Sequence, residues 1–418
     1  MNHSADSILR SGGTRPIQST SPNGVNSAAL ISAAAMIVAG DIWIADAVSG
    51  RQAALFILGT LLGLVLYHAS FGFTSAWRVF ISDRRGSGLR AQMLMLAVAT
   101  ALFFPALASG SLFGQPVTGL VSPLGVSVIF GAFIFGIGMQ MGGGCASGTL
   151  YTVGGGSTRM LITLAAFVVG STVGAYHLSW WSSLPSFPPI SLVKAWGPWL
   201  ALAVHWTVFG CIVVGTLWLE KRAHGSLLAR PAALRSGFPR FLRGPWPILA
   251  GAIGLALLNF ATLALAGRPW GITSAFALWG SKIAGCLGLA DVSNWTYWAS
   301  AERRAELTGS VLNDVTSVMD VGIILGALLA AALAGRFSPK TTISARSAAA
   351  AVVGGLLLGY GARLAYGCNI GAYFSGIASG SLHGWAWMVA AFFGNVLGTR
   401  VRPFFGLEVE RTVRQTGC

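Results

Sequence analysis

Apolar segments of about 20 residues recur along most of the chain, and they limit its possible folds more than any other feature. A helix of about that length spans the ~30 Å hydrocarbon core of a bilayer. The segments show no period-two alternation of the kind that barrel strands need. Since 54% of the 418 residues are hydrophobic and 9% are charged, a soluble domain could not bury the apolar surface. We therefore predict an all-α integral membrane protein with about 9–10 transmembrane helices.

Two glycine-rich stretches, each with one cysteine, interrupt apolar segments at a depth where a membrane helix should continue. They surround Cys145 and Cys368, and their glycines keep the same spacing when the sequence is shifted by 223 residues. The matching positions are Gly131, Gly136, Gly138, Gly144, Cys145 and Gly148, which fall on Gly354, Gly359, Gly361, Gly367, Cys368 and Gly371. A glycine-rich composition alone does not explain spacing kept over this length, so the chain is predicted to consist of two related halves.

Basic residues lie in short clusters between the apolar segments and predict the domain boundaries. Residues 1–27 are rich in Ser, Asn, Gly and Thr and are predicted to form a disordered tail. A basic linker at 220–245 is predicted to separate a first transmembrane repeat, 28–219, from a second, 246–403, with a polar tail at 404–418. Loops rich in Lys and Arg stay in the cytoplasm, so the linker and the C-terminus are assigned to that side.

The same clusters predict the direction of each span. Further basic residues gather at 78–90 and 336–346, and counting spans between the clusters makes the span before Cys145 run inward and the span before Cys368 run outward. We interpret the halves as inverted-topology repeats, which in transporters place the substrate site near the bilayer midplane. The first apolar segment, 28–48, contains two aspartates, so a spanning helix and a surface helix both remain open for it.

Each cysteine is predicted to lie at the N-terminus of a re-entrant half-helix, because the helical segments at 146–153 and 369–377 are too short to cross the bilayer. Free backbone N–H groups and the positive end of the helix dipole favour an anion at such a position. The candidate binding residues at the two breaks are Gly144, Cys145, Ser147, Gly148, Gly367, Cys368, Asn369 and Gly371. The alternative role is a packing thiol among glycines at helix contacts.

Polar residues near a second pair of breaks are further candidates. Thr74 and Ser75 in the first half correspond to Thr273 and Ser274 in the second, and their hydroxyls could either bind substrate or cap a helix. Arg363 lies inside an apolar segment, where an arginine either draws an anion inward or extends to the interface.

Other classes of chemistry find no support in the sequence. The six histidines show no spacing typical of a metal site, and there is no phosphate-binding loop for ATP. Neither a metal nor another cofactor is predicted. The net charge of +15 is confined to loops, which favours contact with anionic lipid over nucleic-acid binding. The role of Cys286 stays open.

The sequence around the two cysteines resembles the YeeE/YedE family of sulfur-transport membrane proteins. The resemblance is carried by Gly144-Cys145-Ala146-Ser147-Gly148 and by the segment from Gly361 to Gly371, and it extends over about residues 50–403. It implies an inner-membrane protein with inverted repeats and re-entrant helices. Members of this family take up thiosulfate, others are linked to selenium metabolism, and cysteines along the path are thought to pass the ion by S–H···S contacts.

One position departs from the family pattern. The family has a third cysteine in a stretch of the type Arg-Phe-Cys-Phe-Asn-Ser-Ala-Phe-Arg, and here Gly72 stands at that place. A sulfur or selenium species other than thiosulfate therefore remains an alternative substrate.

We interpret the chain as a transporter or channel for a small sulfur-containing anion, with thiosulfate as the leading candidate, and not as an enzyme. The alternatives are a transporter of another sulfur or selenium species, a membrane sulfurtransferase or redox protein using Cys368, and a structural subunit. A sulfurtransferase needs a general base beside the thiol, and the Cys368 motif offers none. Membrane lipid is an expected partner, and a small soluble sulfur-carrier protein is a further candidate partner.

Overall fold

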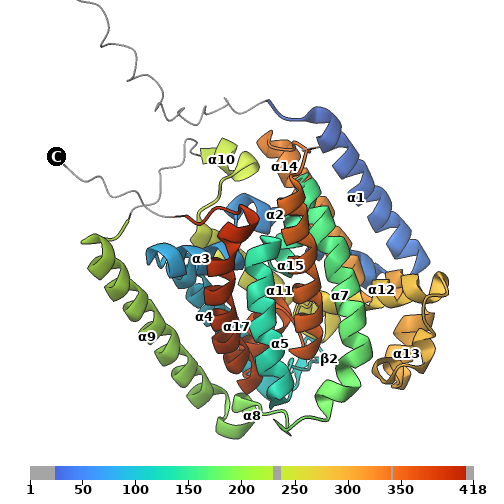
Figure 1. Cartoon of the computed structure of the whole chain (residues 1–418). Coiled ribbons are helices and arrows are strands. Elements are labelled where there is room, and N and C mark those ends of the chain that lie inside the picture. Colours follow the sequence, from blue (N-terminus) through green and yellow to red (C-terminus); the bar gives the residue numbers. More distant parts are fainter. Residues whose placement is uncertain (1–23, 229–236, 340–341, 411–418) are drawn as a thin grey trace, which may run out of the picture.

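The computed structural model describes residues 24–228, 237–339 and 342–410, which form a bundle of helices (Figure 1). Most of the predicted N-terminal tail, the middle of the basic linker and residues 411–418 lie outside the described residues. Within the described part, nine segments are long and apolar enough to cross a membrane. The protein is therefore a multi-pass, all-α membrane protein, as predicted from the sequence.

The elements follow one another with short connections. The first helices of the described chain are α1 (Ser27–Ala47), α2 (Gly50–Ala69), α3 (Phe73–Asp83), α4 (Ser87–Ser109), α5 (Val126–Gly142), α6 (Ala146–Gly154) and α7 (Thr158–Ser182). The middle of the chain forms α8 (Leu192–Trp196), α9 (Pro198–His224), α10 (Gly237–Arg243), α11 (Ile248–Ala266), α12 (Thr273–Cys286) and α13 (Ala301–Thr308). The last helices are α14 (Val315–Ala334), α15 (Ala345–Leu364), α16 (Gly376–Ala378) and α17 (Leu382–Val401).

Shorter elements complete the fold. Single turns of 3-10 helix are η1 (Val292–Asn294), η2 (Thr296–Trp298), η3 (Val311–Asn313) and η5 (Arg402–Phe405), and η4 (Asn369–Ser375) is π-helical. Two antiparallel pairs of two-residue strands join β1 (Ser111–Leu112) to β2 (Gln115–Pro116) and β3 (Leu124–Gly125) to β4 (Ser186–Phe187).

Three boundaries differ from those predicted from the sequence. Helix α1 begins inside the predicted tail, because Asn26 caps it by accepting a hydrogen bond from the Ala29 N–H at 3.1 Å. Helix α9 runs on to His224, inside the range predicted for the linker. The predicted C-terminal tail is partly ordered, since η5 and the residues up to Glu410 pack back on the bundle.

Glycines allow the central helices to pack with their backbones in contact. A methyl group on Gly59 or Gly63 of α2 would overlap the backbone of Met319 or Ile323 in α14. Similar contacts join α5 to α17 and α7 to α15. In lipid there is little hydrophobic force between helices, so this close packing is a main source of their association.

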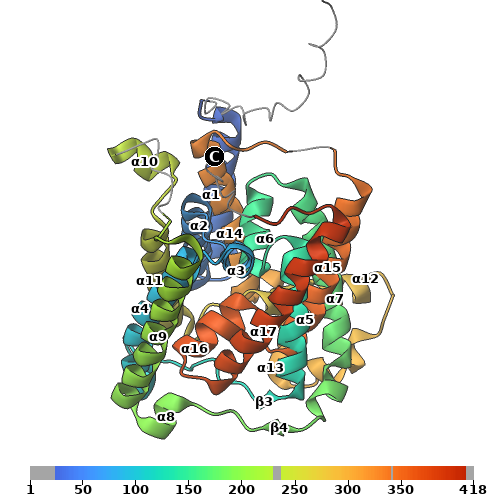
Figure 2. The ribbon, with the colours of Figure 1, turned by 60° about the vertical axis from the view of Figure 1, so that its left-hand side comes forward.

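Several contacts between a helix of the first half and a helix of the second half have a counterpart in which the two halves change roles. Helix α5 packs on α17 while its counterpart α15 packs on α7, and α2 packs on α14 while α11 packs on α4. Two further helices follow the same rule, with α3 against α17 and α12 against α7. Half-helix α6 lies in the upper part of the view in Figure 2 and α16 in the lower part.

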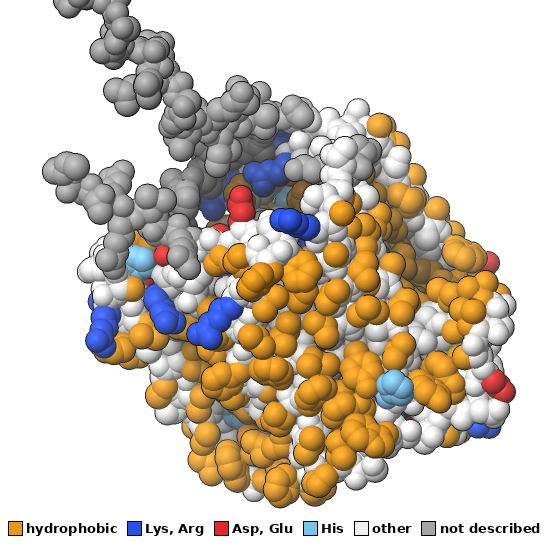
Figure 3. Space-filling view, viewed as in Figure 1, with side chains coloured by type: hydrophobic (Ala, Val, Ile, Leu, Met, Phe, Trp, Pro, Cys, Tyr) orange, Lys and Arg blue, Asp and Glu red, His pale blue; other side chains and the backbone are white. Residues whose placement is uncertain are grey.

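Charged and apolar surfaces are separated along the molecule. Figure 3 shows Lys and Arg side chains gathered toward the upper end of the view, with hydrophobic side chains covering the flank below. Helices α1 and α9 stand at opposite edges of the bundle in Figure 1. Only 17% of the residues in the most apolar part of α1, and 22% in that of α9, are buried against the rest of the protein. A broad apolar flank is the surface that a membrane protein presents to lipid.

Candidate functional site

The first cysteine lies at the end of a break between two helices, as the sequence predicts. Helix α5 ends at Gly142, Gly143 takes a left-handed conformation with φ of 88°, and Cys145 is the N-cap residue of α6. Cys145 is buried, and its Sγ lies 3.4 Å from the hydroxyl of Ser147. Helix α6 has nine residues, too few to cross a bilayer, which agrees with the predicted half-helix.

The second cysteine occupies the equivalent place after α15. Tyr366 and Gly367 turn the chain with φ of 55° and 150°, and Cys368 is the N-cap residue of η4. Its Sγ accepts a hydrogen bond from the Ile370 N–H at 3.4 Å, and the residue is fully buried. The sequence predicted a helical segment here but not its π-helical form, which is frequent at functional sites.

The two breaks meet in the interior of the protein. Cys145 and Cys368 belong to one continuous cluster of buried residues. Helix α6 and η4 are in direct contact, so the two half-helices approach the same region from different parts of the chain. The structure therefore brings together two half-helices that are far apart in the sequence, each with a cysteine as its N-cap residue.

Open space lies beside both cysteines. A methyl group built on Gly371 would meet no described atom within 4 Å, although the residue is buried. At the matching position, a methyl group on Gly148 would meet only the Cys145 sulfur, at 3.6 Å. Buried glycines that face free volume in this way leave room for a small ligand to approach the backbone.

A buried amide adds polar character to this region. Asn369 follows Cys368, is fully buried, and has no hydrogen-bond partner among the described residues for either side-chain atom. A buried unpaired amide is costly, so such a group is explained by a polar ligand or water.

Two further polar side chains, Gln92 and Asp320, lie in this core and were not among the residues predicted from the sequence. Gln92 accepts hydrogen bonds from the Trp77 indole at 2.9 Å and from the Tyr373 hydroxyl at 3.4 Å, while its Nε2 is unpaired among the described residues. Asp320 of α14 is buried with both oxygens unpaired there, and it lies within electrostatic range of Cys368. A carboxyl in an apolar span is a signal that could have identified Asp320.

Gly72, which stands at the place of the third family cysteine, borders the first half-helix. It is the N-cap residue of α3, and a Cβ atom there would lie 3.7 Å from the Tyr151 hydroxyl on α6. The same atom would lie 2.5 Å from Ser75 Oγ, which now donates a hydrogen bond to the Gly72 carbonyl at 3.3 Å. A thiol at this position would therefore face the half-helix that begins at Cys145.

The predicted threonines contact long polar side chains from matching positions of the two halves. Arg363 donates hydrogen bonds to the Thr273 hydroxyl at 3.0 Å and to the Tyr297 hydroxyl at 2.7 Å. Gln140, at the position equivalent to Arg363, donates to the Thr74 carbonyl at 3.3 Å. Arg363 is only 8% exposed, so its guanidinium does not extend to open water.

The remaining predicted residues lie outside the centre. Ser274 donates a hydrogen bond to the Thr316 hydroxyl at 3.1 Å, which ties α12 to α14. Cys286 ends α12 and is exposed, as is Cys211 on α9. No group of three or more His, Cys, Asp or Glu side chains suited to a metal ion occurs within the described ranges.

The fold and the buried centre define a helical membrane protein whose interrupted helices carry cysteines at their N-termini, an architecture of membrane transporters. The chain belongs to the sulphur transport family, which matches residues 68–397.

Two curated relatives match most of this chain, and a third matches a shorter part of it. The thiosulfate transporter TsuA of Spirochaeta thermophila is 30% identical over 355 residues, which is 81% of this chain and 95% of that protein. TsuA of Escherichia coli is 27% identical over 353 residues, or 81% of this chain and 91% of the relative. The probable transporter YedE of Escherichia coli is 30% identical over 167 residues, 40% of each chain.

Proposed function

We propose that the protein carries thiosulfate across the bacterial inner membrane, through the region where Cys145 and Cys368 meet. The observation that supports this most is the free volume beside both thiols, at Gly148 and Gly371. Two relatives that span most of the chain are named thiosulfate transporters. In this proposal the two halves have inverted topology, which the matching packing partners support, and the C-terminus is cytoplasmic.

The chemistry of the two thiols suits a soft anion. Neutral S–H groups donate weak hydrogen bonds to the terminal sulfur of thiosulfate. The orphaned Asn369 amide and the backbone N–H groups at the starts of α6 and η4 hold its oxygens. Several weak contacts in sequence let an ion enter and leave, whereas one strong site would trap it. The anion passes without covalent change, so the protein acts as a transporter and not as an enzyme.

Uptake of radiolabelled thiosulfate into proteoliposomes tests this proposal. Cys145→Ala and Cys368→Ala are expected to reduce uptake strongly, and the double variant is expected to abolish it. Cys211→Ala and Cys286→Ala are matched controls, because both cysteines are exposed and lie outside the centre. Unchanged uptake by the Cys145/Cys368 double variant would eliminate the cysteine path.

A second candidate substrate follows from Gly72. Without a thiol at that position, the path offers one sulfur contact fewer than the family pattern, which favours a different sulfur or selenium anion. Competition of labelled thiosulfate by unlabelled sulfite, selenite and selenosulfate distinguishes the two. If one of these ions competes far better than thiosulfate itself, the second substrate replaces the first.

A further inference from the structure

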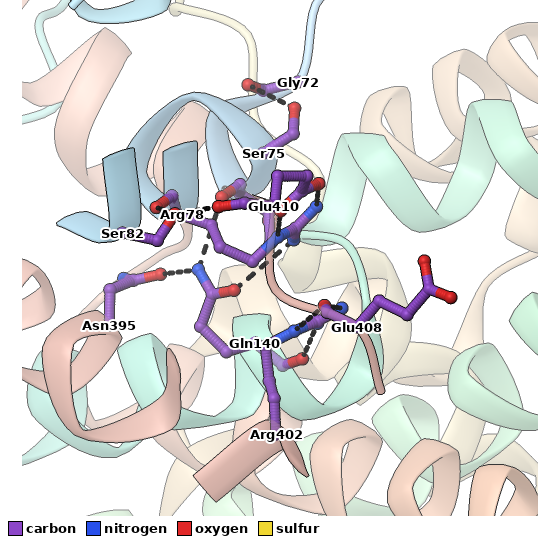
Figure 4. Close-up of polar contacts among 10 residues, drawn as sticks. Gly72, Ser75, Arg78, Ser82, Gln140, Asn395, Arg402, Glu408 and Glu410 are labelled. Atoms are coloured by element: carbon purple, nitrogen blue, oxygen red, sulfur yellow. Dashed lines mark hydrogen bonds and ion pairs between the residues drawn. The ribbon is translucent and has the colours of Figure 1, made fainter. Parts of the chain in front are cut away.

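The C-terminal segment folds back onto a buried arginine of the first half. Arg78 on α3 is 9% exposed, and its Nε and Nη2 donate hydrogen bonds to the two carboxylate oxygens of Glu410 at 2.6 and 2.5 Å. Figure 4 shows the two side chains facing each other across the gap between α3 and the C-terminal segment. This two-pronged geometry is the one in which a guanidinium recognises an oxyanion.

A second arginine and a glutamine complete this cluster. Gln140 accepts a hydrogen bond from Arg78 Nη1 at 3.4 Å and is held by Asn395 of α17. Arg402 donates to the Gln140 carbonyl and lies within electrostatic range of both Arg78 and Glu410. Two buried guanidinium groups therefore lie in one cluster with the Glu410 carboxylate, which pairs with Arg78, and the cluster has an excess of positive charge that an anion offsets.

The arginines differ in what else they bind. Arg402 also donates to the Glu408 carbonyl at 3.0 and 2.8 Å, so it has a structural role in holding the chain end. Arg78 directs two of its nitrogens at a single carboxylate, whose side chain is 41% exposed. The carboxylate can therefore leave toward solvent while Arg78 stays in place.

The cluster adjoins the proposed path. Gln140 lies five residues before Cys145 on α5 and donates to the Thr74 carbonyl at 3.3 Å. Arg78 lies on the same short helix as Thr74, and that helix begins beside Gly72, against the Tyr151 hydroxyl of α6. The cluster therefore borders α5, the helix that ends just before Cys145, and α3, whose first residues lie near α6.

We propose that Arg78, Gln140 and Arg402 form an oxyanion station at this end of the path, and that the Glu410 carboxylate occupies it when substrate is absent. The inference rests on the proposed function. The oxygens of a doubly charged sulfur oxyanion take the places of the two carboxylate oxygens on Arg78. The Glu410 carboxylate is then an internal competitor of the substrate, and it leaves Arg78 when the anion arrives.

Protonation does not open the contact near neutral pH. Burial by itself raises the pKa of Glu410, but the hydrogen bonds and charge of Arg78 outweigh burial and hold this pKa below its usual value. Burial and the charge of Arg78 lower the pKa of Arg402 to about 10, so it stays protonated. The contact is lost only as pH falls through the lowered pKa of Glu410, and at neutral pH a competing anion has to displace it.

Binding and transport by Glu410→Gln test the station. The concentration of thiosulfate for half-maximal binding to the purified protein is expected to fall about tenfold. This is the change expected if the Glu410 carboxylate occupies Arg78 in about nine tenths of the wild-type molecules. Glu408→Gln is the matched control, because it removes the same charge two residues away and its exposed side chain extends away from the cluster in Figure 4. Equal binding by the wild type, Glu410→Gln and Glu408→Gln would overturn the inference.

A second variant keeps the test independent of folding and of the substrate. Arg78→Lys retains the charge but lacks the two-pronged geometry, and it is expected to remove the gain produced by Glu410→Gln when the two are combined.

Inorganic sulfate serves as a probe beside thiosulfate. If Glu410→Gln strengthens sulfate binding through Arg78 but no variant carries thiosulfate, the station stands and the proposed substrate fails. If the cysteine variants abolish transport and Glu410→Gln changes nothing, the reverse holds.

Discussion

Arg363 donates a hydrogen bond to the hydroxyl of Thr273 at 3.0 Å, and so links the helix before Cys368 to the start of α12, the helix at the second break in its half. Gln140 makes the equivalent link to the Thr74 carbonyl in the first half. Each half thus joins its two helix breaks through one long side chain five residues before the cysteine. The halves differ in charge at that position, and the cation that Gln140 lacks is supplied there by Arg78.

Removing the charge of Arg363 is expected to weaken the capture of substrate. Arg363→Gln copies the residue of the other half and can still donate to Thr273. We expect the transport rate at low substrate concentration to fall about tenfold, the lower end of electrostatic effects on association. The measurement is initial uptake at two ionic strengths. The variant should also lose part of the salt dependence, and an unchanged salt dependence would argue against a role in capture.

Filling the free volume at Gly371 separates packing from transport. Gly371→Ala is expected to change the free energy of unfolding in detergent by no more than about 1 kcal/mol, because the methyl group meets no neighbour. Gly371→Val is expected to fold but to block most uptake. Gly63→Ala is the contrasting variant, since its methyl group overlaps the Ile323 carbonyl, and it should cost about 1–3 kcal/mol. Normal uptake by Gly371→Val would place the path elsewhere.

A cysteine introduced at Gly72 is expected to be reached by a small thiol reagent and protected by substrate. Gly72 is partly exposed and borders Tyr151 on the half-helix that follows Cys145. Gly72→Cys is made in a background where the exposed Cys211 and Cys286 are replaced by serine. Mass spectrometry after brief labelling, with and without thiosulfate, gives the result. Labelling that substrate does not slow would show that position 72 lies off the path.

The C-terminal end of α9 is expected to depend on one buried ion pair. Glu220 is fully buried and binds Arg90 at 2.8 Å and the Gly86 N–H at 3.0 Å. Removing the carboxylate leaves Arg90 without its charged partner, so Glu220→Ala should lower the free energy of unfolding by about 3–5 kcal/mol. Glu220→Gln keeps part of the hydrogen bonding and should cost less. Thermal unfolding in detergent, with faster proteolysis after His224, checks both.

The fold could be predicted from the sequence to a large extent, because membrane helices are recognised by apolar length and by the glycines that interrupt them. The break at Cys145, the short helix after it and the match to Cys368 all follow from local sequence. The contact of Arg363 with Thr273 could not be predicted, because it joins positions 90 residues apart and depends on how the helices pack.

The same limit applies to the polar groups that local patterns do not mark. Gln92 becomes notable only when the structure shows it buried and partly unpaired among the described residues, whereas the carboxyl of Asp320 in an apolar span is visible in the sequence. Glu410 lies in a segment whose composition resembles an ordinary polar tail, and its partner Arg78 is 332 residues away in the sequence. Orientation and the inverted relation of the halves remain predictions from charge and spacing.

The seam between α2 and α14 constrains how such a protein can move. Where Gly59 and Gly63 press against the main chain of the neighbouring helix, there are no flexible side chains to rearrange. The two helices therefore move as one rigid unit, because sliding one along the other would make their backbone atoms clash. Any opening of a path through this protein therefore has to come from parts of the fold outside this pair of helices.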